Sequence, residues 1–283
     1  MVFVPDVGRK GMPELPEVET ITRQLRGKVL GQRVKGVEVL DPKLQGKGIR
    51  RIRGEVISSL QRRGKNIIFG FREDLYLIAH PRMTGRFLWH PDPHPLQHLR
   101  AILQLSGGDL YWIDQRRFGT LMVSEDLHLL SSLGVEPLSP EFSEGYLYQI
   151  TKGSLRRIKE FLMDQRRIAG IGNIYAAEIL FSAGIHPQRR ANTLSRGEIA
   201  ILVARTKSIL SKAVQEKGTT VDNYLDTKGD RGGYQELLLV YGKAGEPCPN
   251  CGHPIEKLRQ SGRSTYFCPH CQRAAEIDLS VLS

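Results

Sequence analysis

The sequence predicts an α+β protein, in which an amino-terminal antiparallel β-sandwich with a leading helix is followed by a helical domain and a four-cysteine ribbon. Short β-rich runs follow one another between residues 34 and 123 without helical patterns among them, which is typical of packed antiparallel sheets. Apolar residues recur at helical spacing after residue 142. All four cysteines lie as two close pairs near the carboxyl terminus. A chain of 283 residues, 40% of them apolar, is long enough for two cores and a ribbon.

The leading helix is predicted directly after Pro16. Val18, Ile21 and Leu25 fall on one helical face, and a proline is well suited to the first turn of a helix. A glycine shortly afterwards is expected to end the helix. The pattern therefore predicts one short amphipathic helix before the first strand.

The β-sandwich is predicted to contain six short strands. Their residues are 34–40, 56–60, 66–71, 75–80, 99–105 and 110–113. Gly107 and Gly108 separate the last two strands and predict a tight hairpin between them.

The domain boundaries are predicted where these patterns change. Residues 133–142 contain a glycine and two prolines and break both the strand and the helix period, which favours a linker. The predicted divisions are an extension or mis-assigned start (1–11), the sandwich domain (12–132), the linker (133–142), the helical domain (143–234), the ribbon (235–273) and a tail (274–283).

Two amphipathic helices are predicted beyond the linker. The first is marked by apolar residues at helical spacing, namely Leu155, Ile158 and Leu162. The second begins with the capping box of Ser195 and Glu198 and ends at Gly218. Between the two helices, residues 170–176 are rich in glycine and then helical, so that backbone N–H groups there could bind a phosphate. A packing turn is the alternative interpretation. Basic residues just upstream favour the phosphate interpretation, namely Lys152, Arg156, Arg157, Lys159, Arg166 and Arg167.

The cysteines predict a structural zinc site. Cys248, Cys251, Cys268 and Cys271 have the spacing C-x2-C-x16-C-x2-C, and each close pair can present two thiolates to one tetrahedral Zn²⁺ ion. A reduced, metal-free set of thiols is the alternative. Because the four thiolates complete the site, the neighbouring histidines at 253 and 270 are interpreted as spectators. No cysteine remains for a disulfide or for catalysis.

The charge of the chain predicts a polyanionic partner. Lys and Arg total 41 against 30 Asp and Glu, which gives a formal charge of +11 and a pI near 9.6, so nucleic acid is the expected ligand. A basic protein that binds no nucleic acid is the alternative. The sequence has no run of eighteen apolar residues, and residues 1–11 lack the apolar stretch of a signal peptide. We therefore expect no membrane insertion, and thiolate ligands favour a cytoplasmic location.

Several sequence blocks, in order, resemble one family of DNA repair enzymes. They are MPELPEVET at 12–20, RRGK at 62–65, HPRMTG at 80–85, DQRRFG at 114–119, GIGNIYA at 170–176 and the four cysteines. Together they resemble formamidopyrimidine-DNA glycosylases and cover residues 12 to about 273. The resemblance implies a helix-two-turns-helix domain in the second half of the chain. The PELPE and RRFG blocks favour the oxidised-purine branch over the related endonuclease VIII branch.

The resemblance implies a bifunctional glycosylase and apurinic-site lyase that acts in base excision repair. The family's amino-terminal proline attacks the sugar C1′ of a damaged nucleotide, and Pro13 is the matching residue. Glu14 matches the acid that assists opening of the sugar ring, and Lys65 matches the group associated with β-elimination. Arg263 matches the arginine that grips phosphates and is associated with δ-elimination. Without the resemblance, Glu14 would be a helix-start carboxylate, and Lys65 and Arg263 would be surface charges.

The resemblance also implies residues that hold duplex DNA around the lesion. Met83, Arg116 and Phe118 match the side chains that fill the space of an extruded nucleotide, although spacing alone would place Met83 and Phe118 in the core. Further DNA contacts are implied at His80, Asn173 and Tyr175, with His98 as a weaker candidate. Lys152 is predicted to contact DNA from its place in the basic run before residue 170. The contact near His98 departs from the family pattern, in which a second histidine stands where this chain has Leu96.

The position of Pro13 is the main departure from the family pattern. Twelve residues precede it, and the nitrogen of an internal proline is a tertiary amide without a lone pair for attack. We expect translation to begin at Met12, whose removal would expose the Pro13 amine; cleavage of the extension is an alternative. Two further functions stay open, an oxidised-pyrimidine glycosylase of the same fold and an inert protein that binds damaged DNA. The protein is expected to act as a monomer with one structural Zn²⁺ ion.

Overall fold

The computed structural model describes residues 12–90, 97–220, 226–227 and 229–273, so the predicted extension (1–11) and tail (274–283) lie outside the described residues. The chain forms two compact units. Unit 1 comprises Met1–Ser132 and Ala213–Glu236, and unit 2 comprises Leu133–Lys212 and Leu237–Ser283. Unit 1 thus takes up a late segment of the chain, whereas the sequence-based boundaries divide the chain in order and stay predictions. Among the described helices, none has the length and apolar character needed to cross a membrane.

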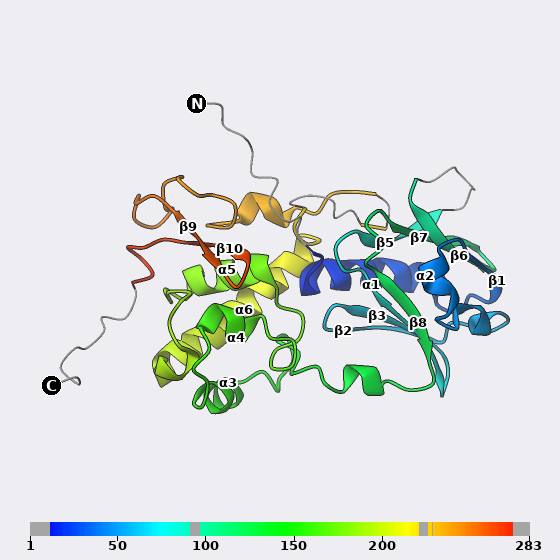
Figure 1. The fold of residues 1–283 in the computed structure, drawn as a ribbon, viewed down its shortest axis with the longest axis horizontal. Helices are drawn as coiled ribbons and strands as arrows, with labels where there is room; N and C mark the ends of the chain where they lie inside the picture. The colour runs from blue at the N-terminus through cyan, green and yellow to red at the C-terminus, as the bar shows by residue number, and fades with distance from the viewer. Residues whose placement is uncertain (1–11, 91–96, 221–225, 228, 274–283) are drawn as a thin grey trace. The chain divides into compact units, whose positions relative to one another are not determined.

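Unit 1 contains two four-stranded antiparallel sheets and one long helix, α1 (Leu15–Val29) (Figure 1). The first sheet has the order β1 (Val34–Val39), β6 (Leu99–Leu105), β7 (Gly108–Asp114) and β5 (Gly85–His90). The second sheet has the order β2 (Ser59–Arg63), β3 (Asn66–Arg72), β4 (Leu75–His80) and β8 (Thr120–Ser124). The short elements α2 (Pro42–Gln45), η1 (Ile49–Ile52) and η2 (His128–Leu130) connect the strands.

One apolar core joins both sheets and α1, which confirms the predicted sandwich and leading helix. The core includes Leu25 of α1, Phe69 of the second sheet, and Phe87 and Trp112 of the first sheet, each no more than 1% exposed. The ring centroids of Phe69 and Phe87 lie 5.4 Å apart, and those of Phe87 and Trp112 lie 4.8 Å apart. The first contact joins the two sheets and the second joins neighbouring strands of the first sheet; such aromatic contacts are favourable beyond the apolar area that they bury.

The strand prediction was wrong in three places. Strand β5 was missed because it begins at Gly85, where an added Cβ atom would lie 2.7 Å from the Trp112 ring; the glycine serves close packing and weakens the strand signal. Strand β8 was also missed. The strand predicted at 56–60 begins only at Ser59, because Val56 and Ile57 pair instead with residues 31–33, between α1 and β1. The β6–β7 hairpin is confirmed, but its two-residue loop is 106–107, and Gly108, which was predicted to lie in the loop, already begins β7.

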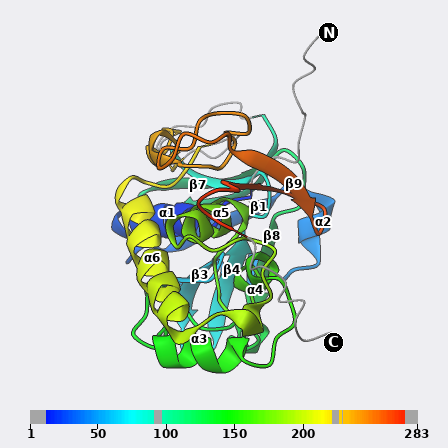
Figure 2. The same ribbon diagram turned by 90° about the vertical axis from the view of Figure 1, so that its left-hand side faces the viewer.

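Unit 2 is helical apart from one hairpin. Its helices are α3 (Glu144–Thr151), α4 (Ile158–Leu162), α5 (Asn173–Ser182) and the short η3 (Ala191–Thr193). The hairpin consists of β9 (Glu256–Gln260) and β10 (Arg263–Phe267), and β10 packs on α5 (Figure 2). Two elements cross the division between the units, α6 (Arg196–Gln215) and η4 (Tyr234–Leu237).

The start of α6 has the predicted capping box. The Ser195 backbone N–H donates to the Glu198 carboxylate at 2.8 Å, and the Glu198 N–H donates to the Ser195 hydroxyl at 3.2 Å. The prediction was wrong for Leu155, which is 66% exposed. Helix α4 begins only at Ile158, so Leu155 lies in the preceding loop and is not on a helical face.

Glu17 connects residues 218–219, in the late segment of unit 1, to the start of α1. This buried carboxylate accepts hydrogen bonds from the backbone N–H of Glu14 at 2.8 Å and of Thr219 at 2.6 Å. Gly218 has a φ of +81°, and a Cβ atom there would lie 2.7 Å from the Glu17 carboxylate. A glycine is therefore required where the chain returns to α1. The same carboxylate fixes the backbone at Glu14, which is one of the predicted catalytic residues.

Candidate nucleic-acid interface and metal centre

Pro13 and Glu14 lie immediately before α1, and both are buried. Glu14 is the N-cap residue of α1 and is 2% exposed. The helix-start interpretation of Glu14 is therefore confirmed, and its carboxyl group lies at the positive end of the helix dipole.

Lys65 and His80 lie close enough to interact electrostatically in unit 1. Lys65 follows Gly64 in the two-residue turn between β2 and β3, and Gly64 has a φ of +57°, as a type II′ hairpin requires. Lys65 is only 5% exposed, so the alternative of an ordinary surface charge is wrong. His80 ends β4.

His80 is held as a neutral imidazole. Burial, together with the positive charges of Arg82 and Lys65, lowers the pKa of His80 to about 3. The Arg82 backbone N–H donates to His80 Nδ1 at 3.0 Å. The ring proton therefore lies on Nε2, where it can donate to a phosphate oxygen.

Two turns of unit 1 are joined by Thr84 and Asp114. The Thr84 hydroxyl donates to the Asp114 carboxylate and accepts from the Arg116 N–H at 2.9 Å. The other Asp114 oxygen accepts from the Gly119 N–H at 2.7 Å. Asp114 is 1% exposed. This buried carboxylate therefore places the turn that carries Arg116 and Phe118 beside the turn that carries Met83.

The side chains on these turns face solvent. Phe118 is 50% exposed, which makes the core alternative wrong for this residue, and Met83 is half-buried. The Arg116 guanidinium carbon lies 4.8 Å from the centroid of the Phe118 ring, a cation–π contact. His98 is exposed, and its backbone carbonyl accepts from the Asp114 N–H at 3.0 Å. The structure thus places Arg116 and Phe118 together at the surface, on a turn that is hydrogen-bonded to Thr84, the neighbour of Met83.

Arg117 anchors the same turn from the other side. It has a φ of +57°, which is unusual for a residue with a side chain. Its guanidinium Nε donates to the Asp41 carboxylate at 2.8 Å. The hydrogen bond from Arg117 lowers the pKa of Asp41, so the ion pair that holds this turn persists at neutral pH.

In unit 2, Lys159 joins Asn173 to the β9–β10 hairpin. The buried Lys159 Nζ donates to Asn173 Oδ1 and Thr265 Oγ1, each at 2.7 Å, and to the Ser264 carbonyl at 3.1 Å. Asn173 Nδ2 also donates to the Ser264 carbonyl, at 3.0 Å. Asn173 is the first residue of α5, so the start of this helix lies against β10.

Arg263 is presented by a tight turn next to this contact. Ser261 and Gly262 have φ values of 46° and 74°, which is the pattern of a type I′ hairpin turn. Arg263 begins β10 and is exposed, one residue before Ser264. Lys159 therefore brings exposed Arg263 near the N–H groups at the start of α5, as a site for phosphates requires.

The other predicted DNA contacts of unit 2 differ in exposure. Lys152 is exposed at the end of α3. Tyr175 is fully buried, so its side chain supports α5 and does not reach a ligand in this conformation. In the basic run before α5, Arg156 and Arg167 both form ion pairs with Asp164. That run is therefore less available to DNA than its charge suggests.

The sequence interpretation missed two residues at this site. Lys159 was assigned to a surface cluster but is 2% exposed. Tyr241 was not considered, although Asn173 Nδ2 lies 3.4 Å from its hydroxyl. Glu178 of α5 holds the backbone N–H of Tyr241 at 2.8 Å. Both residues contact partners more than sixty positions away, and no local pattern signals such contacts.

The four cysteine sulfurs are arranged to hold one metal ion. All of them lie within 4.8 Å of one another. The Cys248 and Cys271 sulfurs are 3.8 Å apart, and those of Cys251 and Cys268 are 3.5 Å apart. A tetrahedron with zinc–sulfur bonds of about 2.3 Å has sulfur–sulfur edges of about 3.8 Å. The residues fit a structural Zn²⁺ ion, as predicted.

Matches to known domain families cover most of the chain. The model of the formamidopyrimidine-DNA glycosylase N-terminal domain matches residues 12–121, and that of the formamidopyrimidine-DNA glycosylase H2TH domain matches residues 133–224. The model of a zinc finger found in FPG and IleRS matches residues 245–274. All three match in the order expected from the sequence blocks.

Full-length relatives share this order. A formamidopyrimidine-DNA glycosylase from Exiguobacterium sp. is 40% identical over 275 residues, covering 93% of this chain and 100% of the relative. One from Desulfitobacterium hafniense is 42% identical over 272 residues, covering 92% and 100%.

Solved structures agree with the fold. The MutM (FPG) protein from Thermus thermophilus has a TM-score of 0.84 at 41% identity, covering 92% of this chain and 98% of that one. The Lactococcus lactis Fpg bound to DNA containing an abasic site has a TM-score of 0.86 at 34% identity, covering 92% and 100%. The chain therefore belongs to the formamidopyrimidine-DNA glycosylase family of base-excision DNA repair enzymes.

Proposed function

We propose that this protein is a bifunctional glycosylase and apurinic-site lyase that removes oxidised purines such as 8-oxoguanine and formamidopyrimidines from duplex DNA. Family membership supports the glycosylase activity. The L. lactis relative has been solved with DNA containing an N7-benzyl-Fapy-dG lesion and with DNA containing an abasic site. The burial of Pro13, Glu14 and Lys65 within unit 1 is the observation that carries the proposal.

The nucleophile in this proposal is the secondary amine of Pro13. Its nitrogen forms a bond to the sugar C1′ while the bond from C1′ to the base breaks and the base leaves with a proton. The iminium that results is a permanent cation and accepts electrons during elimination. An α-amino group has an ordinary pKa of about 7.7–8.0, so a substantial fraction is neutral near pH 7. A lysine amine is far less available.

The other catalytic roles follow the family pattern. Glu14 gives a proton to the sugar-ring oxygen as the ring opens, and Lys65 is associated with β-elimination of the 3′ phosphate. Arg263 binds the phosphates around the lesion and is associated with the δ-elimination that follows. Burial of Glu14 and Lys65 supports these roles, because proton transfer is more effective when water is excluded around the reacting groups.

The remaining roles concern DNA that has lost a stacked nucleotide. Phe118 wedges beside the lesion, Met83 fills the vacated space and Arg116 donates to the orphaned base. His80, His98 and Lys152 donate to phosphates through their side chains, and Asn173 donates through its backbone N–H at the start of α5. The four cysteines would hold a Zn²⁺ ion that stabilises the ribbon presenting Arg263. Because one chain contains all these groups, we infer that a monomer is sufficient for activity.

Borohydride trapping tests the proposal directly. Two chains are compared on 8-oxoguanine duplex, one beginning at Pro13 and one retaining residues 1–11. The chain beginning at Pro13 is expected to give a covalent adduct and cleaved DNA, whereas the longer chain is expected to bind without trapping. Intact mass and terminal sequencing of the native protein are expected to show Pro13 first. A trapped adduct from the longer chain would show that another amine attacks, and Lys65→Ala is then the first variant to test.

An oxidised-pyrimidine substrate is the second candidate. One observation favours it: the wild-type L. lactis relative has also been solved with DNA containing an oxidised pyrimidine. Matched duplexes that differ only in the lesion decide between the two. Faster single-turnover excision of the purine supports the primary proposal, and faster excision of the pyrimidine reverses the order.

A further inference from the structure

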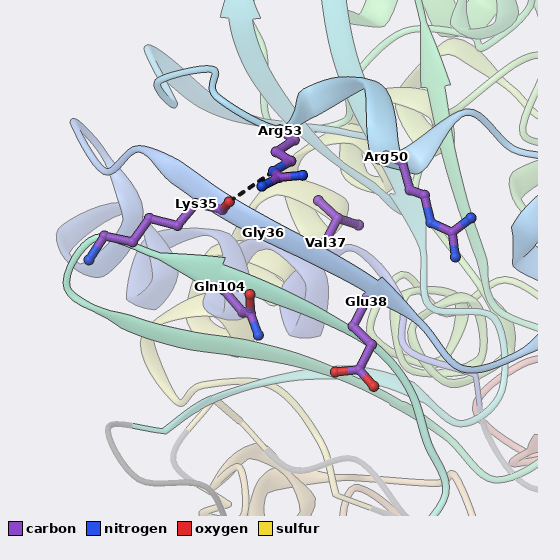
Figure 3. A pocket seen from close by; sticks show the side chains of 7 residues that line it. All are labelled: Lys35, Gly36, Val37, Glu38, Arg50, Arg53 and Gln104. Carbon is purple, nitrogen blue, oxygen red and sulfur yellow. Dashed lines mark hydrogen bonds between the residues drawn. The ribbon is translucent and has the colours of Figure 1, made fainter.

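A groove of about 480 Å³ lies on unit 1 and has no part in the site described above. It is lined by residues 35–38 of β1, by Arg50 and Arg53 beside them, and by Gln104 of β6 (Figure 3). Gly36 leaves room for this shape, because a Cβ atom there would lie 2.0 Å from the Gln104 amide oxygen. Arg53 Nε donates to the Lys35 carbonyl at 3.3 Å, which ties the segment after η1 to β1. We name this feature the β1 groove.

The β1 groove is strongly cationic. Residues 32–53 contain seven basic residues and two acidic residues, and the Asp41 carboxylate is paired with Arg117. In the described part of the chain, Lys35, Arg50 and Arg53 form no ion pair with a carboxylate. Glu38 is the one acidic residue among those that line the groove. Unpaired cations held close together on a concave surface raise the local concentration of anionic ligands.

The groove is separate from the turns that carry Met83 and Phe118. Gln104 pairs with Asp109 across β6 and β7, five residues before the Asp114 end of β7. At a rise of about 3.4 Å per residue, the two places are ~17 Å apart along the strand. The groove also lies at β1, one edge strand of the sheet, whereas the turns lie next to β7 and β5, at the opposite edge. The groove is therefore a surface distinct from the turns.

We propose that the β1 groove binds the phosphodiester backbone of a second segment of duplex DNA while the first segment is held at the lesion site. Guanidinium and ammonium groups are the side chains that phosphates prefer, and their contacts need no base sequence. An acidic protein partner fits less well, because the groove offers Val37 as its single apolar lining side chain, whereas protein interfaces use aromatic and aliphatic anchors. The inference rests on the DNA binding of the proposed function and not on the glycosylase reaction.

The experiment loads the lesion site first. The protein is saturated with a duplex that contains a tetrahydrofuran abasic analogue, and the anisotropy of a labelled, lesion-free duplex is then measured. The Lys35→Glu/Arg50→Glu variant is compared with Lys28→Glu/Arg205→Glu, which makes the same change of net charge at exposed residues of α1 and α6. The groove variant is expected to weaken binding of the second duplex at least tenfold, and the control variant less than threefold. Affinity for the first duplex should be unchanged in both.

Several outcomes would overturn the proposal. They are the absence of a ternary complex with unaltered protein, and equal losses in the two variants. A third such outcome is that the unaltered protein binds a poly-glutamate peptide but not the second duplex, and that only the groove variant loses this peptide binding. Failure of the first duplex to bind would instead contradict the proposed function. In that case the affinity of the labelled lesion-free duplex is measured without the first duplex. The groove variant must again bind it at least tenfold more weakly, and the control variant less than threefold.

Discussion

The environment of His80 shows how neighbouring residues set the chemistry of one side chain. A histidine is usually half protonated near pH 6.5, and a protonated ring would attract phosphate. Here burial and two adjacent cations favour the neutral ring instead. The charge at this place is supplied by Lys65 and Arg82, and His80 supplies a directed hydrogen bond.

We predict that His80 stays neutral from pH 5 to pH 8. Because its folded pKa of about 3 lies below the ordinary value, His80 contributes stability above about pH 6.5 that is lost as the pH falls toward 3. Long-range ¹H–¹⁵N NMR spectra should show the Nε2-protonated neutral ring across this range. When duplex affinity is measured against pH in this range, the unaltered protein should show no transition that is absent from His80→Gln. Protonation of His80 above pH 5 would contradict the assigned tautomer and its cause.

A second prediction concerns Phe118 and Met83. Replacing either by alanine should slow excision from duplex DNA by about tenfold or more, because these side chains offset the few kcal/mol needed to extrude a nucleotide. Cleavage at a preformed abasic site should fall less, since the base is already absent. Single-turnover rates on the two substrates measure the difference. Equal losses, accompanied by a lower melting temperature, would mean that the residues act in folding.

At the scale of elements, the zinc ribbon is connected to the helical part of unit 2 through buried polar groups. Gln272 accepts from the Cys268 N–H and donates to the Ile185 carbonyl, each at 2.9 Å. Lys159 makes the corresponding contact with β10. The metal site and Arg263 lie at opposite ends of the same hairpin, so loss of the metal should disturb the position of Arg263.

We predict that Cys268→Ser releases zinc and weakens duplex binding while unit 1 stays folded. Three remaining thiolates hold the ion poorly, and the energy of metal binding is part of the folding energy of the ribbon. Metal stoichiometry, duplex affinity and NMR signals of unit 1 check the three parts. His270→Ala is the matched control and should retain one zinc ion, because four thiolates suffice. Full zinc content in Cys268→Ser would contradict the four-thiolate site.

At the scale of the whole molecule, the formal charge of +11 is spread over both units. Part of it is already neutralised within the fold, as the pairs of Asp164 with Arg156 and Arg167 show. The exposed, unpaired cations are therefore a better guide to DNA contacts than the total charge.

The salt dependence of duplex affinity should reveal this distinction. Each phosphate contact contributes about −0.9 to the slope of log K against log salt concentration. Lys152→Ala should reduce the magnitude of the slope by about one. Arg156→Ala should change it less, because this arginine is paired with Asp164. Affinity measured between about 50 and 200 mM salt provides the slopes. Equal changes in the two variants would show that the pairing does not persist in the complex.

The sequence alone determined the features that depend on short stretches of chain. The cysteine pairs, the Ser195–Glu198 capping box and the β6–β7 hairpin each involve residues that are close in sequence, so spacing is sufficient evidence. The ordered blocks also identified the family. The roles assigned to Pro13 and the other site residues stay predictions, because they depend on contacts with DNA.

Only the tertiary structure decided which polar residues build the site. Lys159 looks like one cation of a surface run, yet it is buried against Thr265, a residue 106 positions later. Asp114 orients a turn through Thr84, thirty positions earlier, and Leu155 lies outside the helix that its spacing predicts. The free energy of a buried polar group depends on the partners that surround it in space. Local sequence does not record those partners, and so it leaves the environment of each side chain undetermined.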